Sequence, residues 1–166
     1  MEQKRKMRRA LQQLSQAESE EILRRGSCGV LALQGDDGYP YAVPLSYCFE
    51  GGRLYFHCAK AGYKLDCIAR SPKASFCVVD KDDVIPEKYT TAYRSVIAAG
   101  RVQVMKEASA ARAAAEALGR KYHPAGTEEE LQAEISGAWD RLCLLEMEVE
   151  ALTGKQGREL MQEKKG

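Results

Sequence analysis

The sequence predicts an α+β fold built on an antiparallel barrel of six strands with flanking helices. Runs rich in β-branched and aromatic residues are separated by tight turns that contain glycine, which is typical of an antiparallel meander. Helical segments with capping signals stand between and beside these runs. With 166 residues the chain has the length of one domain. We expect that domain to span residues 1–166, with flexible tails at 1–12 and 156–166.

The first half of the chain carries four of the predicted strands and two of the helices. A helix is expected over 15–25, because Ser15 and Glu18 have the spacing of a capping box. A second helix is expected to begin near Ala61 and to end before Pro72. The predicted strands cover 28–34, 39–50, 53–59 and 74–80.

The second half adds two strands and two helices. One long strand is expected over 91–105, with a bend at Gly100. The alanine-rich segment 108–122 is helical by composition, and Thr127 with Glu130 repeats the capping-box spacing at the start of a helix that runs toward Trp139. The alternation in 142–150 predicts a half-solvated strand.

Composition excludes several classes of function. The net charge is +1, which argues against a nucleic-acid-binding surface or a site for anionic membranes. No apolar run approaches the roughly 20 residues of a membrane span, and the basic N-terminus lacks the apolar region of a secretion signal. We therefore expect a cytoplasmic protein.

Six cysteines are present, and none forms a CxxC pair. Most lie in apolar, strand-like runs, so we interpret them as reduced thiols of the core. His57 and Cys58 are adjacent, but neighbours on a strand point to opposite faces. No metal site is expected.

The stretch 41–49 alternates between large and small residues. Tyr41, Val43 and Leu45 belong to the large face, and Ala42, Pro44 and Ser46 belong to the small face. An ordinary core strand explains this pattern if another element covers its small face. Pro44 cannot donate a ladder hydrogen bond, however, which places the strand at an edge or a bulge, where a flat heterocycle could lie against it.

The segment YFHCAKAGYKLD (55–66) passes from a strand into a helix through small residues. Gly62 permits close approach of a ligand, and the first helical turn offers unpaired N–H groups. Lys64 would place its ammonium group beside an anion bound there. A solvated lysine is the simpler interpretation of that residue. The motifs of nucleoside-triphosphate loops and of dinucleotide folds are both missing.

Together these stretches resemble a known family. DGYPYAVPLSY, GGRLYFHCAKAGYKLDCI and SVIAAGRV are similar to segments of the pyridoxamine 5′-phosphate oxidase-like flavoproteins, and most of all to their nitroimidazole-resistance (Nim) branch. The resemblance extends from about Met7 to Lys155. It implies a six-stranded split β-barrel, a homodimer, and FMN held in two clefts at the subunit interface.

The resemblance also implies roles for individual residues. Lys64 would bind the phosphate, and His57 would lie beside flavin and substrate. An alternative for His57 is a partly buried, hydrogen-bonded strand histidine, and His123 is interpreted as structural or solvent-facing. The residues implied to contact FMN are Val43, Pro44, Leu45, Ser46, His57, Cys58, Ala59, Lys64, Ser95 and Val96.

The chain departs from the vitamin B6 oxidases at its C-terminus. It ends TGKQGRELMQEKKG and lacks their arginine-rich motif, so oxidation of pyridoxamine phosphate is not expected. The expected function is reduction of small electron-poor molecules such as nitroaromatics, with NAD(P)H as electron donor. The alternative is a non-catalytic flavin-binding module that stores flavin or senses redox state. A nucleic-acid-binding barrel is disfavoured by the balanced charge.

Overall fold

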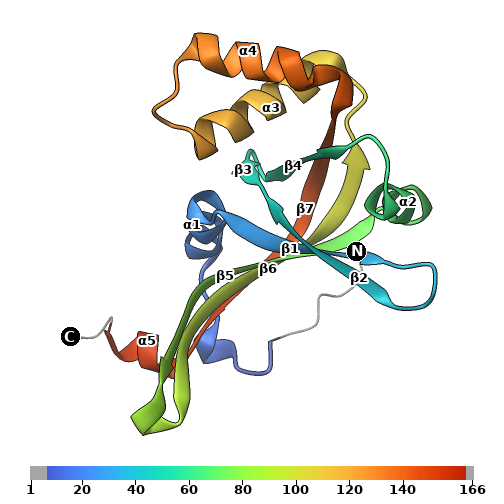
Figure 1. Cartoon of the computed structure of the whole chain (residues 1–166). Helices are drawn as coiled ribbons and strands as arrows, with labels where there is room; N and C mark the ends of the chain where they lie inside the picture. Colours follow the sequence, from blue (N-terminus) through green and yellow to red (C-terminus); the bar gives the residue numbers. More distant parts are fainter. Residues whose placement is uncertain (1–6, 164–166) are drawn as a thin grey trace.

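The computed structural model describes residues 7–163, which form one seven-stranded antiparallel sheet with flanking helices (Figure 1). The strand order is β2-β1-β5-β6-β7-β4-β3. The sheet curls without closing, and β2 near one edge contacts β4 near the other. The strands are β1 (Cys28–Gln34), β2 (Pro40–Ser46), β3 (Cys48–Glu50), β4 (Arg53–Ala59), β5 (Lys73–Ile85), β6 (Thr90–Val104) and β7 (Leu142–Gln156). The α+β split barrel expected from the sequence is confirmed.

The helices lie around this barrel (Figure 1). A hairpin of two helices, α3 and α4, covers β3, β4 and the start of β7, while α2 lies near the β1–β2 turn. The helical elements are η1 (Ala10–Gln12), α1 (Gln16–Arg25), α2 (Tyr63–Arg70), η2 (Pro86–Lys88), α3 (Ala108–Tyr122), α4 (Glu128–Ala138), η3 (Trp139–Arg141) and α5 (Arg158–Glu163). No helix within residues 7–163 is long and apolar enough to cross a membrane.

Both predicted capping boxes are present. The Ser15 hydroxyl accepts from the amide of Glu18, and the Glu18 carboxylate accepts from the amide of Ser15. Thr127 and Glu130 make the same reciprocal pair at the start of α4. Each box satisfies two backbone donors that the first helical turn leaves without partners.

The predicted strand 39–50 is two strands, which corrects the expected number from six to seven. The break falls at Tyr47, whose amide donates to the Tyr122 hydroxyl at 2.8 Å. The same hydroxyl lies 3.0 Å from the Tyr47 carbonyl. Because a side chain at the end of α3 takes both backbone groups, Tyr47 leaves the ladder and the chain turns from β2 into β3.

Two strands, β5 and β7, extend well beyond their predicted ends, whereas β6 differs from its predicted bounds by one residue at each end. β5 and β6 continue as a two-stranded arm that projects from the barrel, and β7 continues to Gln156 (Figure 1). At the predicted bend, the pairing of β6 with β7 shifts by one residue: Ala99 opposes Ala151 and Gly100 opposes Val149, so the extra residue of this bulge is Glu150 of β7. The bend in β6 itself stays a prediction. Parts of both predicted tails are folded: Gln12 and Leu160 are buried. Residues 1–6 and 164–166 of those tails lie outside the described residues.

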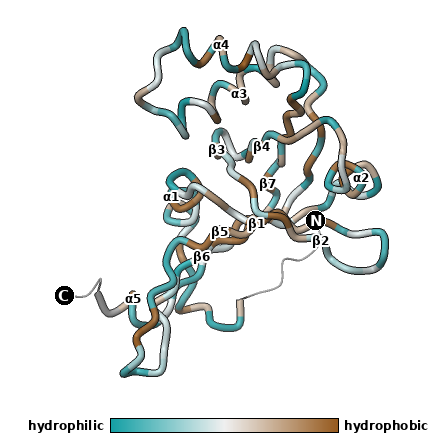
Figure 2. The backbone as a smooth tube through the Cα atoms, in the orientation of Figure 1, coloured by the Kyte–Doolittle hydropathy of each residue, from teal (hydrophilic) through white to brown (hydrophobic). Residues whose placement is uncertain are grey.

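Two clusters of buried side chains hold the fold together. The larger lies inside the barrel and includes the aromatic pair Phe56 and Phe76, with ring centroids 5.0 Å apart. The smaller joins α3 and α4 to the sheet through Leu118, Ile135 and Leu144. Figure 2 shows hydrophobic residues concentrated where the barrel strands cross, and hydrophilic residues at the β1–β2 turn and along much of α4.

Candidate functional site

The start of α2 is an open helix N-terminus. Gly62 is its N-cap residue and has φ +135°, a conformation that favours glycine. No side chain caps the helix. The Leu65 amide bonds to the Gly62 carbonyl at 2.9 Å, whereas the amides of Tyr63 and Lys64 have no acceptor among the described residues. This backbone can receive an anion, as the sequence predicted.

Lys64 supplies a cation at the same place. Its side chain is half-buried and forms no ion pair within residues 7–163. Burial raises the pKa of the neighbouring Cys58 thiol to about 11, with a further contribution from Cys143, while the ammonium group of Lys64 acts in the opposite direction. Lys64 therefore lies close to Cys58, and that thiol is protonated at neutral pH.

Tyr63 fixes the helix start against the β1–β2 hairpin. Its hydroxyl donates to the Asp36 carboxylate at 2.6 Å and accepts from the Asp36 amide at 3.0 Å. Its ring meets the ring of Tyr41 edge-on, with centroids 4.9 Å apart, and Arg70 pairs with Asp36 at 3.1 Å. The open N-terminus is thereby held beside the beginning of β2. Sequence reasoning missed Tyr63 and Asp36, since their partnership is created by the tertiary fold.

β2 is an edge strand, which confirms the position inferred from Pro44. Val43 and Leu45 are half-buried and pack against the barrel core. Ala42, Pro44 and Ser46 are exposed on the other face. No described element of the same chain covers that small face, so the alternative of an ordinary covered core strand does not hold. The strand offers a shallow surface and a row of backbone groups along its free edge.

β4 places His57 and Cys58 on opposite faces, as expected. His57 and Ala59 are exposed, whereas Cys58 is half-buried and opposes Cys143 of β7. His57 makes no hydrogen bond to another described residue, so the alternative of a hydrogen-bonded structural histidine is not supported. Among the described residues, no group of three or more histidine, cysteine, aspartate or glutamate side chains is placed to hold a metal ion.

Ser95 and Val96 differ in what they present to the surface. The Val96 side chain is fully buried in the core, so it cannot contact a ligand on the outside of the sheet. Ser95 is half-buried on the outer face, where it opposes Val79 of β5 and Lys155 of β7. Of this pair, only the Ser95 side chain remains a candidate.

The cysteines are less uniformly buried than expected. All six are free, and Cys48, Cys67 and Cys143 are buried. Cys58 and Cys77 are half-buried, and Cys28 is exposed. The interpretation as core thiols therefore holds for three of the six.

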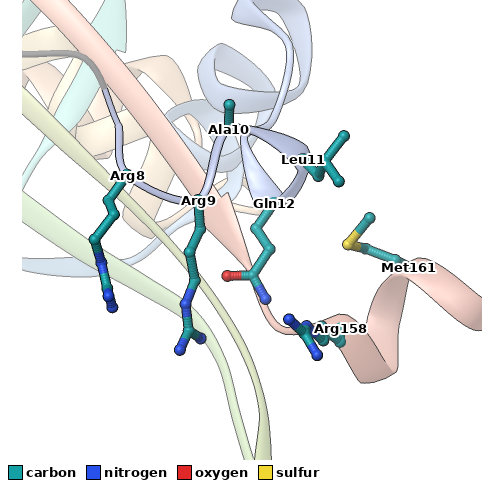
Figure 3. A pocket seen from close by; sticks show the side chains of 7 residues that line it. All are labelled: Arg8, Arg9, Ala10, Leu11, Gln12, Arg158 and Met161. Atoms are coloured by element: carbon teal, nitrogen blue, oxygen red, sulfur yellow. The ribbon is translucent and has the colours of Figure 1, made fainter.

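Two cavities lie away from these residues. One, of about 590 Å³, lies between residues 8–12 and α5, where the side chains of Arg9 and Gln12 point to the same side (Figure 3). The other, of about 730 Å³, lies between α3 and α4 and includes the exposed His123. Neither is lined by a residue that the resemblance implies for flavin binding.

Comparison with known proteins decides the family. The sequence profile described as pyridoxamine 5′-phosphate oxidase matches residues 15–156. The chain belongs to this family. The match covers every strand of the barrel and the whole of the candidate site. No curated protein sequence matches the chain.

Solved structures of similar fold agree with that assignment. A conserved hypothetical protein, Rv2991, from Mycobacterium tuberculosis aligns with a TM-score of 0.80 and 20% identity, over 94% of this chain and 93% of that one. A candidate 5-nitroimidazole antibiotic resistance protein from Bacteroides thetaiotaomicron aligns with a TM-score of 0.73 and 18% identity, over 87% of this chain and 86% of that one. The FAD and heme binding protein from Mycobacterium smegmatis aligns with a TM-score of 0.70 and 21% identity, over 89% of this chain and 74% of that one. At these identities the likeness concerns the fold.

Proposed function

We propose that this protein binds flavin, specifically FMN, and reduces small electron-poor molecules such as nitroaromatics with NAD(P)H. The observation that carries the proposal is the uncapped start of α2, with Gly62 at positive φ and Lys64 without an ionic partner in the described chain, fixed beside the edge strand β2. A phosphate on an apolar ring system needs these two features side by side. Family membership supports a flavin, and one structural relative is described as FAD-binding.

The residues of the site have distinct roles in this proposal. Lys64 and the free amides of the first α2 turn hold the phosphate. The segment 43–46 supports the isoalloxazine ring, and 57–59 follows the ribityl chain. Bound flavin supplies hydride chemistry, so no protein nucleophile is required. His57 is exposed at this end of β4, and its imidazole is a group that can donate a proton to the reduced product.

The outer face of the sheet supports a homodimer. Val30, Val79 and Ile97 are 40%, 62% and 49% exposed, which is unusual for large apolar side chains. Strand register places Val30 opposite Pro44 and Cys77, and Cys77 opposite Ile97, so the patch is continuous over four strands. A second copy of the chain would cover this patch and complete the cleft beside the small face of β2.

Anaerobic titration tests the catalytic part of the proposal. The protein loaded with FMN is mixed with NADH or NADPH, and the visible flavin absorbance is followed. Bleaching by either donor, reversed by a nitroaromatic acceptor, is the expected result. Bound flavin that neither donor reduces would contradict an NAD(P)H-dependent reductase and would favour the non-catalytic store or sensor. Pyridoxamine 5′-phosphate is not expected to serve as a substrate.

A further inference from the structure

A cavity of about 440 Å³ adjoins the start of α2. It is bounded by residues that precede and begin α2, the end of β6, the start of α3, η3 and the start of β7. Its volume falls within the range of small-molecule pockets. None of the residues implied for flavin contact lines it, so it is distinct from the site described above.

Two lysines give the cavity a positive charge. Lys60 and Lys106 line it, are exposed, and form no ion pair with another described residue. The adjacent acid, Glu107, is occupied as the cap of α3, since its carboxylate accepts from the amides of Ser109 and Ala110 at 3.0 and 2.6 Å. That cap closes the helix start to an external anion, which leaves the two ammonium groups as the anion-binding groups.

Apolar side chains form the rest of the cavity wall that matters for ligand binding. Trp139, the single tryptophan of the chain, lines the cavity together with Met105 and Leu65. The Arg112 guanidinium lies over the indole, 5.8 Å from the ring centroid, and helps to hold the ring in place. An aromatic side chain and two ammonium groups that line one cavity suit a heterocyclic base attached to phosphates.

The cavity adjoins the open start of α2, where Lys64 is proposed to bind the flavin phosphate. Leu65, which lines the cavity, directly follows Lys64. Cys143 also lines it and opposes Cys58, the thiol that lies beside Lys64. A ligand that occupies the cavity is therefore next to the proposed flavin phosphate.

We propose that this cavity binds the adenosine diphosphate portion of a dinucleotide, with adenine against Trp139 and the diphosphate on Lys60 and Lys106. The other half of the dinucleotide would reach toward the flavin site, so this inference rests on the proposed function. Two dinucleotides share this chemistry: the nicotinamide electron donor, and a flavin dinucleotide that would replace FMN. In the flavin dinucleotide, Lys64 would hold the phosphate nearer the flavin, and the phosphate on the adenosine side would lie on Lys60 and Lys106.

Fluorescence of Trp139 tests the proposal on the full-length protein. Titration with ADP-ribose should quench the emission in a saturable way. Lys60→Gln with Lys106→Gln should raise the apparent Kd at least tenfold, whereas Lys73→Gln, an exposed lysine at the start of β5, should leave it unchanged. Absence of quenching, or a Kd that the double substitution does not change, would overturn the assignment.

Two further arms identify the source of the adenosine diphosphate. If the donor binds here, ADP-ribose competes with NAD(P)H on protein saturated with FMN. If a flavin dinucleotide binds here, FAD binds at least tenfold more tightly than FMN, and the double substitution abolishes the difference. Quenching by ADP-ribose without any flavin binding would refute the proposed function alone. FMN binding without a response to ADP-ribose would refute this inference alone.

Discussion

Lys64 is the residue on which the flavin proposal makes its sharpest claim. If its ammonium group contacts the phosphate, Lys64→Ala should weaken FMN binding by about 1.5–3 kcal/mol, the usual worth of a hydrogen bond to a charged group. That corresponds to roughly a 10- to 150-fold increase in Kd. Quenching of flavin fluorescence on binding measures it directly.

A matched lysine controls for the general loss of positive charge. Lys88 is exposed in η2 at the tip of the β5–β6 arm, so Lys88→Ala should leave FMN affinity unchanged. Equal affinities for the Lys64→Ala and wild-type proteins would show that the phosphate is bound elsewhere.

Asp80 makes a prediction about pH. It is nearly buried between Arg25 and Arg94, each 2.5 Å from one of its carboxylate oxygens. Burial raises the pKa of this carboxyl, but the hydrogen bonds and charges of the two arginines outweigh it, and the net pKa is lowered. A carboxylate with a lowered folded-state pKa stabilises the fold above its unfolded pKa of about 3.9, and this stabilisation is lost as pH falls through the folded value.

Asp80→Asn should therefore lower the unfolding free energy by about 2 kcal/mol at pH 7, because it leaves two guanidinium groups without their partner. The difference from wild type should shrink as the pH falls below about 4. Denaturant unfolding at several pH values measures it. The control is Asp82→Asn, at an exposed position of the same strand that forms no ion pair in the described part of the chain, and it should differ little from wild type. A difference for Asp80→Asn that persists unchanged at pH 3 would contradict this role.

At the scale of elements, Gly100 tests the close approach of β6 to the bulge in β7. A Cβ atom there would lie 1.9 Å from the carbonyl oxygen of Glu148 on β7, so Gly100→Ala must displace backbone. We expect a loss of about 2 kcal/mol or more in unfolding free energy. Gly137→Ala in α4 is the opposite case, since a Cβ atom added there would meet no described atom within 4 Å apart from the neighbouring backbone of its own helix. It should stabilise the helix by about 0.5–1 kcal/mol. Equal effects of the two substitutions would contradict the bulge.

Local signals predicted elements well and their ends less well. Ser15 and Thr127 predicted the starts of their helices correctly, because a capping box is made by residues that are close in sequence. The break between β2 and β3 at Tyr47 was not predictable. Its cause is the hydroxyl of Tyr122, which lies 75 residues further along the chain. The β5 side of the arm was missed because Asp82 and Asp83 look like loop residues, although they pair with β6.

The candidate site shows the same division. Gly62, Lys64 and the edge position of Pro44 were accessible from residue type and spacing. Tyr63 and Asp36 were not, since the contact that docks α2 on the β1–β2 hairpin depends on the fold. The buried side chain of Val96 was placed in the site by family resemblance, which transfers positions without their burial.

At the scale of the whole molecule, the exposed outer face predicts the oligomeric state. Val79→Lys with Ile97→Lys would put two charges into the proposed subunit interface, and the protein should become monomeric. Ala113→Lys with Ala133→Lys adds the same charge on exposed positions of α3 and α4 and should leave a dimer. Sedimentation velocity separates these outcomes. A wild-type protein that is monomeric with flavin bound would contradict an interface cleft.

The central claim is that the junction of β4 and α2 holds the phosphate of a flavin. The most direct measurement is the visible absorbance spectrum of the protein after incubation with FMN and removal of free ligand, read together with the melting temperature. We predict that flavin bands remain with the protein and that its melting temperature rises. A colourless protein whose melting temperature FMN does not change would contradict the claim.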